Sequence, residues 1–266
     1  MPTLAPSPRR RTIRNETAIE LLDGEIRRIA ELIADTSPAA PIPGCDRDLA
    51  DLTEHVALVH KWAATIVESL TPRRIEQRSI EVQVPADWSA VPAWFSRNGA
   101  ELVAVLRAAD PDAPVYSWGA DQHVGFWIRR MLHETTIHRT DVEACTGVAG
   151  RIEPAVAVDA VDELLDILPF ADFFRPNVRD LHGDGETIHL HATDLDGTDL
   201  RGEWLITLEP EGFRYSHAHV KGAAAVRGTA QDLALFAYGR RKVGDPQLDV
   251  IGDLSLLAHW SSKSAI

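Results

Sequence analysis

The spacing of apolar residues changes along the chain, and this change limits the folds that it can adopt. Five segments before residue 170 have apolar residues close to every 3.6 positions, which predicts amphipathic helices. They span residues 17–35, 46–70, 87–110, 121–146 and 154–168. Residues 37–45, rich in Pro and Gly, end the first helix, and Gly147 ends the fourth.

After residue 180 the pattern becomes that of short strands. Asp196 and Gly197 form a strong hairpin signal between two of them. The strand-like runs are residues 187–193, 204–208 and 213–220. A helix is predicted over residues 231–240, and one more short strand is expected earlier in the chain, over residues 78–84.

These patterns predict two domains of different class. We expect a disordered tail over residues 1–15, a helical bundle over residues 16–172 and a small α+β domain over residues 180–266. A chain of 266 residues is long enough for two domains of ordinary size.

Charge disfavours nucleic acid as a partner. The chain has 40 Asp and Glu against 27 Lys and Arg, a formal net charge of −13, whereas a phosphate backbone attracts clustered Lys and Arg. One basic cluster, formed by Arg9, Arg10, Arg11 and Arg14, lies in the Pro-containing tail, where solvation explains it.

The sequence predicts a protein of a reducing compartment that does not span a membrane. No apolar run approaches the roughly 20 residues that a membrane helix needs, and the N-terminus lacks the apolar core of a signal peptide. We therefore expect a cytoplasmic protein. Cys45 and Cys145 are too few for a disulfide framework and lie in no CxxC motif, so we interpret them as ordinary thiols.

A possible metal site lies on the fourth predicted helix. Glu134 and His138 are four residues apart, which places both side chains on one helical face. His55 lies on the second predicted helix. Two imidazoles and a carboxylate from facing helices would give a divalent metal three protein ligands and leave a position open, as in catalytic sites.

Spacing alone also allows simpler interpretations. Glu134 and His138 could be a surface pair and His55 an interface histidine, and by spacing alone this is the favoured interpretation. His60, five residues past His55, is a rival ligand on another face of its helix. His133 points about 140° away from His138, so the two should not share a metal.

Three segments resemble one known family. They are WIRRMLHETTIHRTDVEA at residues 127–144, DLTEHVALVHKWAA at residues 51–64 and DAVDELL at residues 159–165. Together they are similar to motifs of the mycothiol-dependent maleylpyruvate isomerase family. The stretch from Pro43 to Asp46 departs from that family, whose members commonly have a Trp shortly before this helix.

The resemblance implies a fold and a set of ligands. It implies a DinB-like four-helix bundle that binds a divalent metal, followed by a small α/β domain resembling the sterol-carrier fold. The family's metal ligands fall on His55, Glu134 and His138. An arginine near Arg240 and Arg241 contributes to activity in the family, and we assign that role to Arg240; a cation at a helix C-terminus would also be favoured by the helix dipole.

The resemblance also implies a reaction. We expect a metalloenzyme, with Zn²⁺ as the favoured metal, that uses the thiol cofactor mycothiol on a small-molecule substrate. The thiolate would add to an activated double bond, permit rotation and leave, or it would be transferred to an electrophile. A monomer or homodimer is expected. The alternative is a non-catalytic protein that binds a small ligand with a degenerate bundle.

Several other polar residues have more than one interpretation. Asp141 is placed to orient His138, although a solvated face explains it equally well. Arg129 and Arg130 are expected to make surface or interdomain contacts. The pairs His189/His191 and His217/His219 lie on predicted strands, each pair on one face; a second metal site is possible there, but a solvent-facing sheet surface is favoured.

Overall fold

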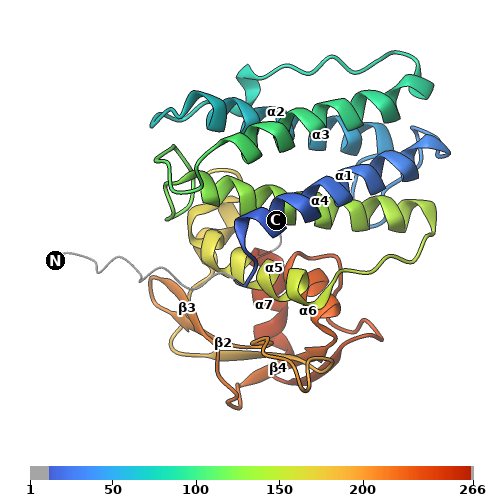
Figure 1. Cartoon of the computed structure of the whole chain (residues 1–266). Helices are drawn as coiled ribbons and strands as arrows, with labels where there is room; N and C mark the ends of the chain where they lie inside the picture. Colours follow the sequence, from blue (N-terminus) through green and yellow to red (C-terminus); the bar gives the residue numbers. More distant parts are fainter. Residues whose placement is uncertain (1–11, 265–266) are drawn as a thin grey trace.

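The computed structural model describes residues 12–264 (Figure 1). Most of the predicted tail, residues 1–11, lies outside the described residues. Within the described part, Ile13 is already buried and the first helix begins at Asn15. No helix in this part is both long enough and apolar enough to cross a membrane.

The first four helices form a bundle. Helices α1 and α2 each pack against both α3 and α4 (Figure 1). Their bounds are Asn15–Ala34 for α1, Leu49–Ser69 for α2, Val91–Ala108 for α3 and Val124–Thr146 for α4. Asp48 caps α2 by accepting from the Asp51 N–H at 2.9 Å, and Gly147 ends α4 at a positive φ of 70°.

Helix α4 buries polar as well as apolar side chains. It packs against α1 and α2 of the bundle and also contacts the next helix, α5 (Pro154–Ile167) (Figure 1). Its buried residues therefore include Arg130, His133, Arg139 and Glu143, which find charged partners on other elements. This explains why its apolar stripe is weaker than those of α1 and α2.

The C-terminal part is a mixed five-stranded sheet with helices on one face. The strand order is β3-β2-β1-β4-β5, with β1 parallel to β4 and the other pairs antiparallel. The strands are β1 (Thr187–Ala192), β2 (Glu203–Glu209), β3 (Gly212–Ser216), β4 (Ala224–Gly228) and β5 (Asp249–Gly252). Helices α5, α6 (Ala230–Ala237) and α7 (Leu254–Ser264) lie on the side of the sheet nearer the bundle (Figure 1).

Alternation along the strands separates the two faces of this sheet. Ile188 and Leu190 of β1 and Trp204 and Ile206 of β2 are buried, and helix α6 packs on β1 and β4. The residues that alternate with them along each strand, such as His189 and Glu203, therefore point to the opposite face. The predicted order, a helical bundle followed by a small α/β domain, is confirmed.

One predicted strand is wrong. No strand forms over residues 78–84. The chain makes a short 3-10 helix at Gln77–Ser79 and continues as irregular backbone. Apolar alternation describes an extended chain, but a strand also needs a hydrogen-bonding partner, and all the sheet strands described lie after residue 186. The domain boundary at residue 172 stays a prediction, because α5 contacts both α4 and α6.

Candidate metal centre

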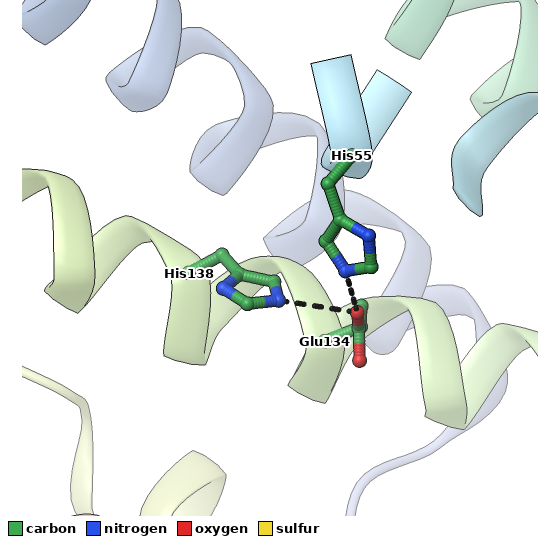
Figure 2. A group of neighbouring side chains, drawn as sticks. All are labelled: His55, Glu134 and His138. Atoms are coloured by element: carbon green, nitrogen blue, oxygen red, sulfur yellow. Dashed lines mark ion pairs between the residues drawn. The ribbon is translucent and has the colours of Figure 1, made fainter. Parts of the chain in front are cut away.

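The structure brings His55, Glu134 and His138 together (Figure 2). Oε1 of Glu134 lies 3.3 Å from Nε2 of His55 and 3.2 Å from Nε2 of His138. The ligand atoms of the three residues all lie within 4.8 Å of one another. The family resemblance implied this convergence, and the interpretation that spacing alone favoured, a surface pair with His55 as an interface histidine, does not hold.

Helix geometry explains the placement of the three side chains. Glu134 and His138 are one turn apart on α4, and α2 packs against α4 so that His55 faces both. The side chains are 27% exposed for His55, 22% for Glu134 and 11% for His138. The cluster is therefore shielded on the bundle side and still reachable from solvent, so a small ligand can approach it.

Glu134 is held in its charged form. Burial would raise the pKa of Glu134, but hydrogen bonds from His138 and His55 and the charge of Arg130 outweigh burial and hold this pKa well below its usual value. Nη2 of Arg130 lies 3.2 Å from Oε2 of Glu134, which leaves Oε1 directed at the two imidazoles.

Asp141 is buried beside His138, which favours the orienting role over the solvated face that the sequence allowed equally. Nδ1 of His138 lies 2.9 Å from Oδ2 of Asp141, so the ring presents Nε2 to the cluster. Burial would lower the pKa of His138, but its bonds to Asp141 and Glu134 raise it overall. A carboxylate behind a ligand imidazole is the usual support of a metal-binding histidine.

Arg240 joins this arrangement from the C-terminal domain. Its Nε and Nη2 donate to the two oxygens of Asp141 at 3.1 and 2.9 Å, and Nη1 donates to the carbonyl of Tyr238 at 2.7 Å. Burial would raise the pKa of Asp141, but bonds from His138 and Arg240 lower it to about 2. Arg240 thus reaches across to the bundle but lies behind His138; its catalytic role stays a prediction.

A buried network behind Glu134 was not recognised from the sequence. Arg130 is 4% exposed and donates to Oε2 of Glu163 at 2.8 Å, and the Tyr238 hydroxyl donates to the same oxygen at 2.7 Å. The Arg130 guanidinium also lies 5.9 Å from the centre of the Tyr238 ring. The available signal was the spacing of Arg130 and Glu134, one helical turn apart.

Arg129 binds helix α5, which lies within the bundle domain predicted over residues 16–172, so an interdomain role for Arg129 stays a prediction. Its guanidinium donates to both carboxylate oxygens of Asp159 at 2.9 and 3.1 Å and to Asp166 at 3.0 Å, both on α5. His133 lies 2.7 Å from the same Asp159 carboxylate and, as predicted, takes no part in the cluster.

His60, the rival ligand, does not take part in the cluster. It is fully buried, and its Nε2 lies 2.8 Å from the hydroxyl of Thr135 on α4. Burial lowers the pKa of His60 to about 3, so the ring is neutral. Because His60 comes five residues after His55 on α2, its side chain faces the bundle interior. There a neutral imidazole can pack and satisfy one hydrogen bond.

The donor set fits a divalent metal. Imidazole and carboxylate ligands suit Zn²⁺ and other first-row divalent ions, and Asp141 supplies the carboxylate behind a ligand imidazole. The fold and this cluster together define a two-domain protein: a helical bundle with a candidate metal centre, joined to a small mixed α/β domain that reaches it through one arginine.

Comparisons with known proteins identify the family. The family model described as the mycothiol maleylpyruvate isomerase N-terminal domain matches residues 19–143, and the corresponding C-terminal domain model matches residues 155–259. The chain therefore belongs to the mycothiol-dependent maleylpyruvate isomerase family. No curated protein matches the sequence.

Solved structures share the fold at low sequence identity. A crystal structure of the mycothiol-dependent maleylpyruvate isomerase is 13% identical, with a TM-score of 0.58, and covers 91% of this chain and 95% of its own. A histidine-to-alanine mutant of that enzyme gives a TM-score of 0.60 at the same identity and coverage. At this identity the likeness establishes the common two-domain architecture.

Proposed function

We propose that this protein is a mycothiol-dependent metalloenzyme that isomerises a maleylpyruvate-like substrate. Transfer of the thiol to an electrophile is the other reaction that the same site could perform. One observation supports the proposal most: in a member of this family, His55, Glu134 and His138 converge on one point that solvent can reach.

The residues of the chain divide the work at this site. His55, Glu134 and His138 would hold the metal, for which Zn²⁺ is the best match to the donor set. The bound metal would lower the pKa of the mycothiol thiol, so that a thiolate is available near neutral pH. Asp141 keeps Nε2 of His138 directed at the cluster, and Arg130 orients the Glu134 carboxylate.

Arg240 is proposed as a positioning residue. Its guanidinium makes a bidentate pair with the Asp141 carboxylate. Through Asp141 it would hold His138 in place and make the site depend on docking of the two domains.

The reaction is tested with the metal-loaded protein, mycothiol and a panel of cis-enoic acids and electrophiles. Maleylpyruvate is included, isomerisation is followed by absorbance and thiol adducts are identified by mass spectrometry. A cis-to-trans product that requires both metal and mycothiol supports the isomerase. An adduct alone would make the protein a thiol transferase, and a folded protein that retains no metal would favour a ligand-binding protein.

Replacing Arg240 with alanine should lower kcat/KM by about 10- to 100-fold, the usual cost of losing the support of a metal ligand. Asp141→Asn should have a similar effect, and the double variant should be little worse than either single one, because both act through His138. Steady-state kinetics of the three variants measures this.

Arg241→Ala is the matched control. Arg241 is paired with Asp232 and Asp245 inside the C-terminal domain, so its removal should change kcat/KM less than threefold, on the order of a surface substitution. Additive losses from Arg240→Ala and Asp141→Asn would show that Arg240 acts independently of Asp141.

A further inference from the structure

A second cluster of imidazoles and a carboxylate lies in the C-terminal domain. Oε2 of Glu203 is 3.0 Å from Nε2 of His189 and 2.6 Å from Nδ1 of His219. The ligand atoms of these three residues all lie within 4.8 Å of one another. Nε2 of His191 is 4.0 Å from the other oxygen, Oε1, so a third imidazole faces the same carboxylate.

The sheet register explains how this cluster forms. His189 and His191 are two residues apart on β1 and share a face, and His191 pairs directly with Glu203 on β2. His219 comes from the connection between β3 and β4, which passes beside His189: a Cβ added to Gly222 would lie 3.0 Å from the His189 backbone nitrogen. Segments far apart in sequence thus meet at one carboxylate.

The expectation of a solvent-facing histidine surface does not hold for two of the four histidines, His189 and His217. His189 is only 7% exposed, covered by its neighbours. His217 and His219 do not share a face, because β3 ends at Ser216. Nε2 of His217 instead lies 3.0 Å from Asp162 on α5, on the helix side of the sheet. The cluster therefore draws its histidines from β1 and from the turn after β3.

The arrangement repeats that of the bundle cluster. In both, two imidazole nitrogens approach the same carboxylate oxygen, at 3.3 and 3.2 Å around Glu134 and at 3.0 and 2.6 Å around Glu203. Two ligands bound to one tetrahedral Zn²⁺ at its usual bond lengths are about 3.3 Å apart. The two contacts of Glu203 are about 0.3 and 0.7 Å shorter than this spacing, so a bound metal would move these atoms apart by about those amounts.

Ion pairing alone does not require so many imidazoles. One protonated histidine neutralises one carboxylate, whereas the rings of His189, His191 and His219 lie 5.7 to 6.0 Å from one another around Glu203. Three positive imidazoles at this separation would repel each other. Neutral imidazoles do not repel each other, and a divalent cation bound by them would neutralise the carboxylate.

We propose that His189, Glu203 and His219 form a second divalent-metal site, with His191 as a further ligand. Imidazole and carboxylate donors select a first-row ion such as Zn²⁺, Ni²⁺ or Co²⁺. The cluster lies on the face of the sheet opposite the helices, and these helices separate it from the bundle (Figure 1). Its metal would not take part in the reaction at Glu134; it would tie the connection between β3 and β4 to strands β1 and β2.

The test is the number of Zn²⁺ ions bound per full-length chain, measured by elemental analysis after gel filtration. The wild-type chain should hold two, and His219→Ala should hold one, because removing a ligand should weaken binding by more than about 100-fold, beyond the effect of losing an outer support of a ligand. His219 is 78% exposed, so this change should leave the fold intact, which circular dichroism checks. His138→Ala should also hold one, and the double variant none.

Two further measurements separate this site from the bundle site. In the His138→Ala background, Zn²⁺ should raise the melting temperature, and adding His219→Ala should remove that rise. The matched control is His123→Ala, an exposed histidine paired with the single carboxylate of Asp121, which should keep two ions. A wild-type chain with one ion that His138→Ala loses, or two ions retained by His219→Ala, would overturn the second site and leave the proposed function standing.

Discussion

Replacing His138 with alanine should remove the metal from the bundle and abolish turnover together. His138 would supply one of the three proposed ligand atoms, and its imidazole also connects the cluster to Asp141 and Arg240. We expect Zn²⁺ affinity at this site to fall by more than about 100-fold, beyond the effect of losing an outer support of a metal ligand. Elemental analysis and the mycothiol-dependent assay measure the two losses in parallel.

His60→Asn is the informative control for this experiment. His60 is the nearest other histidine on α2, but its ring bonds Thr135 inside the bundle. The variant should keep its bundle metal and its activity, provided that it folds. Full activity in a metal-free His138→Ala protein would refute the proposed mechanism, and loss of metal from a folded His60→Asn protein would refute the ligand set.

The second large effect is on stability. Asp159→Ala should destabilise the protein by roughly 3–5 kcal/mol, the cost of removing one partner from a buried ion pair. Asp159 is 1% exposed and accepts from both Arg129 and His133, which would keep their polar groups buried without it. Urea unfolding followed by circular dichroism measures the change.

Asp166→Ala tests whether the loss comes from burial. Asp166 also pairs with Arg129, but its side chain is 35% exposed, so water can replace it more easily. Its replacement should cost clearly less than that of Asp159. Equal losses from the two variants would contradict the role of Asp159 as the main buried partner of Arg129.

The stability provided by Asp159 should depend on pH. Burial would raise the pKa of Asp159, but the charge of Arg129 and the bond from His133 hold it well below its usual value. The ionised form is thus favoured in the folded state, and its contribution is complete above the unfolded pKa of about 3.9. The difference between wild type and Asp159→Ala should shrink as pH falls from about 5 to 3 and beyond; a difference that grows on acidification would contradict this.

Local pattern was sufficient for much of the helical half. The 3.6-residue periodicity predicted α1 to α5 to within a few residues, and the four-residue spacing placed Glu134 and His138 on one face of α4. Both follow from helix geometry within a single segment. The participation of His55 depended on the resemblance to a known family, because no local rule pairs α2 with α4.

Local pattern failed where a partner decided the outcome. Residues 78–84 alternate like a strand but have no neighbouring strand to pair with. His217 and His219 were expected on one face, but the strand ends before them and their side chains separate. In each case the outcome depends on whether a distant part of the chain supplies a hydrogen-bonding neighbour.

By itself, the sequence determined the helices, the change to a sheet and the residue types that could bind a metal, because propensity, periodicity and side-chain chemistry act over a few residues. Tertiary structure alone decided that His55 rather than His60 reaches Glu134, that Arg240 of the second domain binds Asp141, and that three histidines surround Glu203. These contacts depend on how whole elements pack and register, and packing is set by the sum of the buried surfaces of the chain and by no single segment.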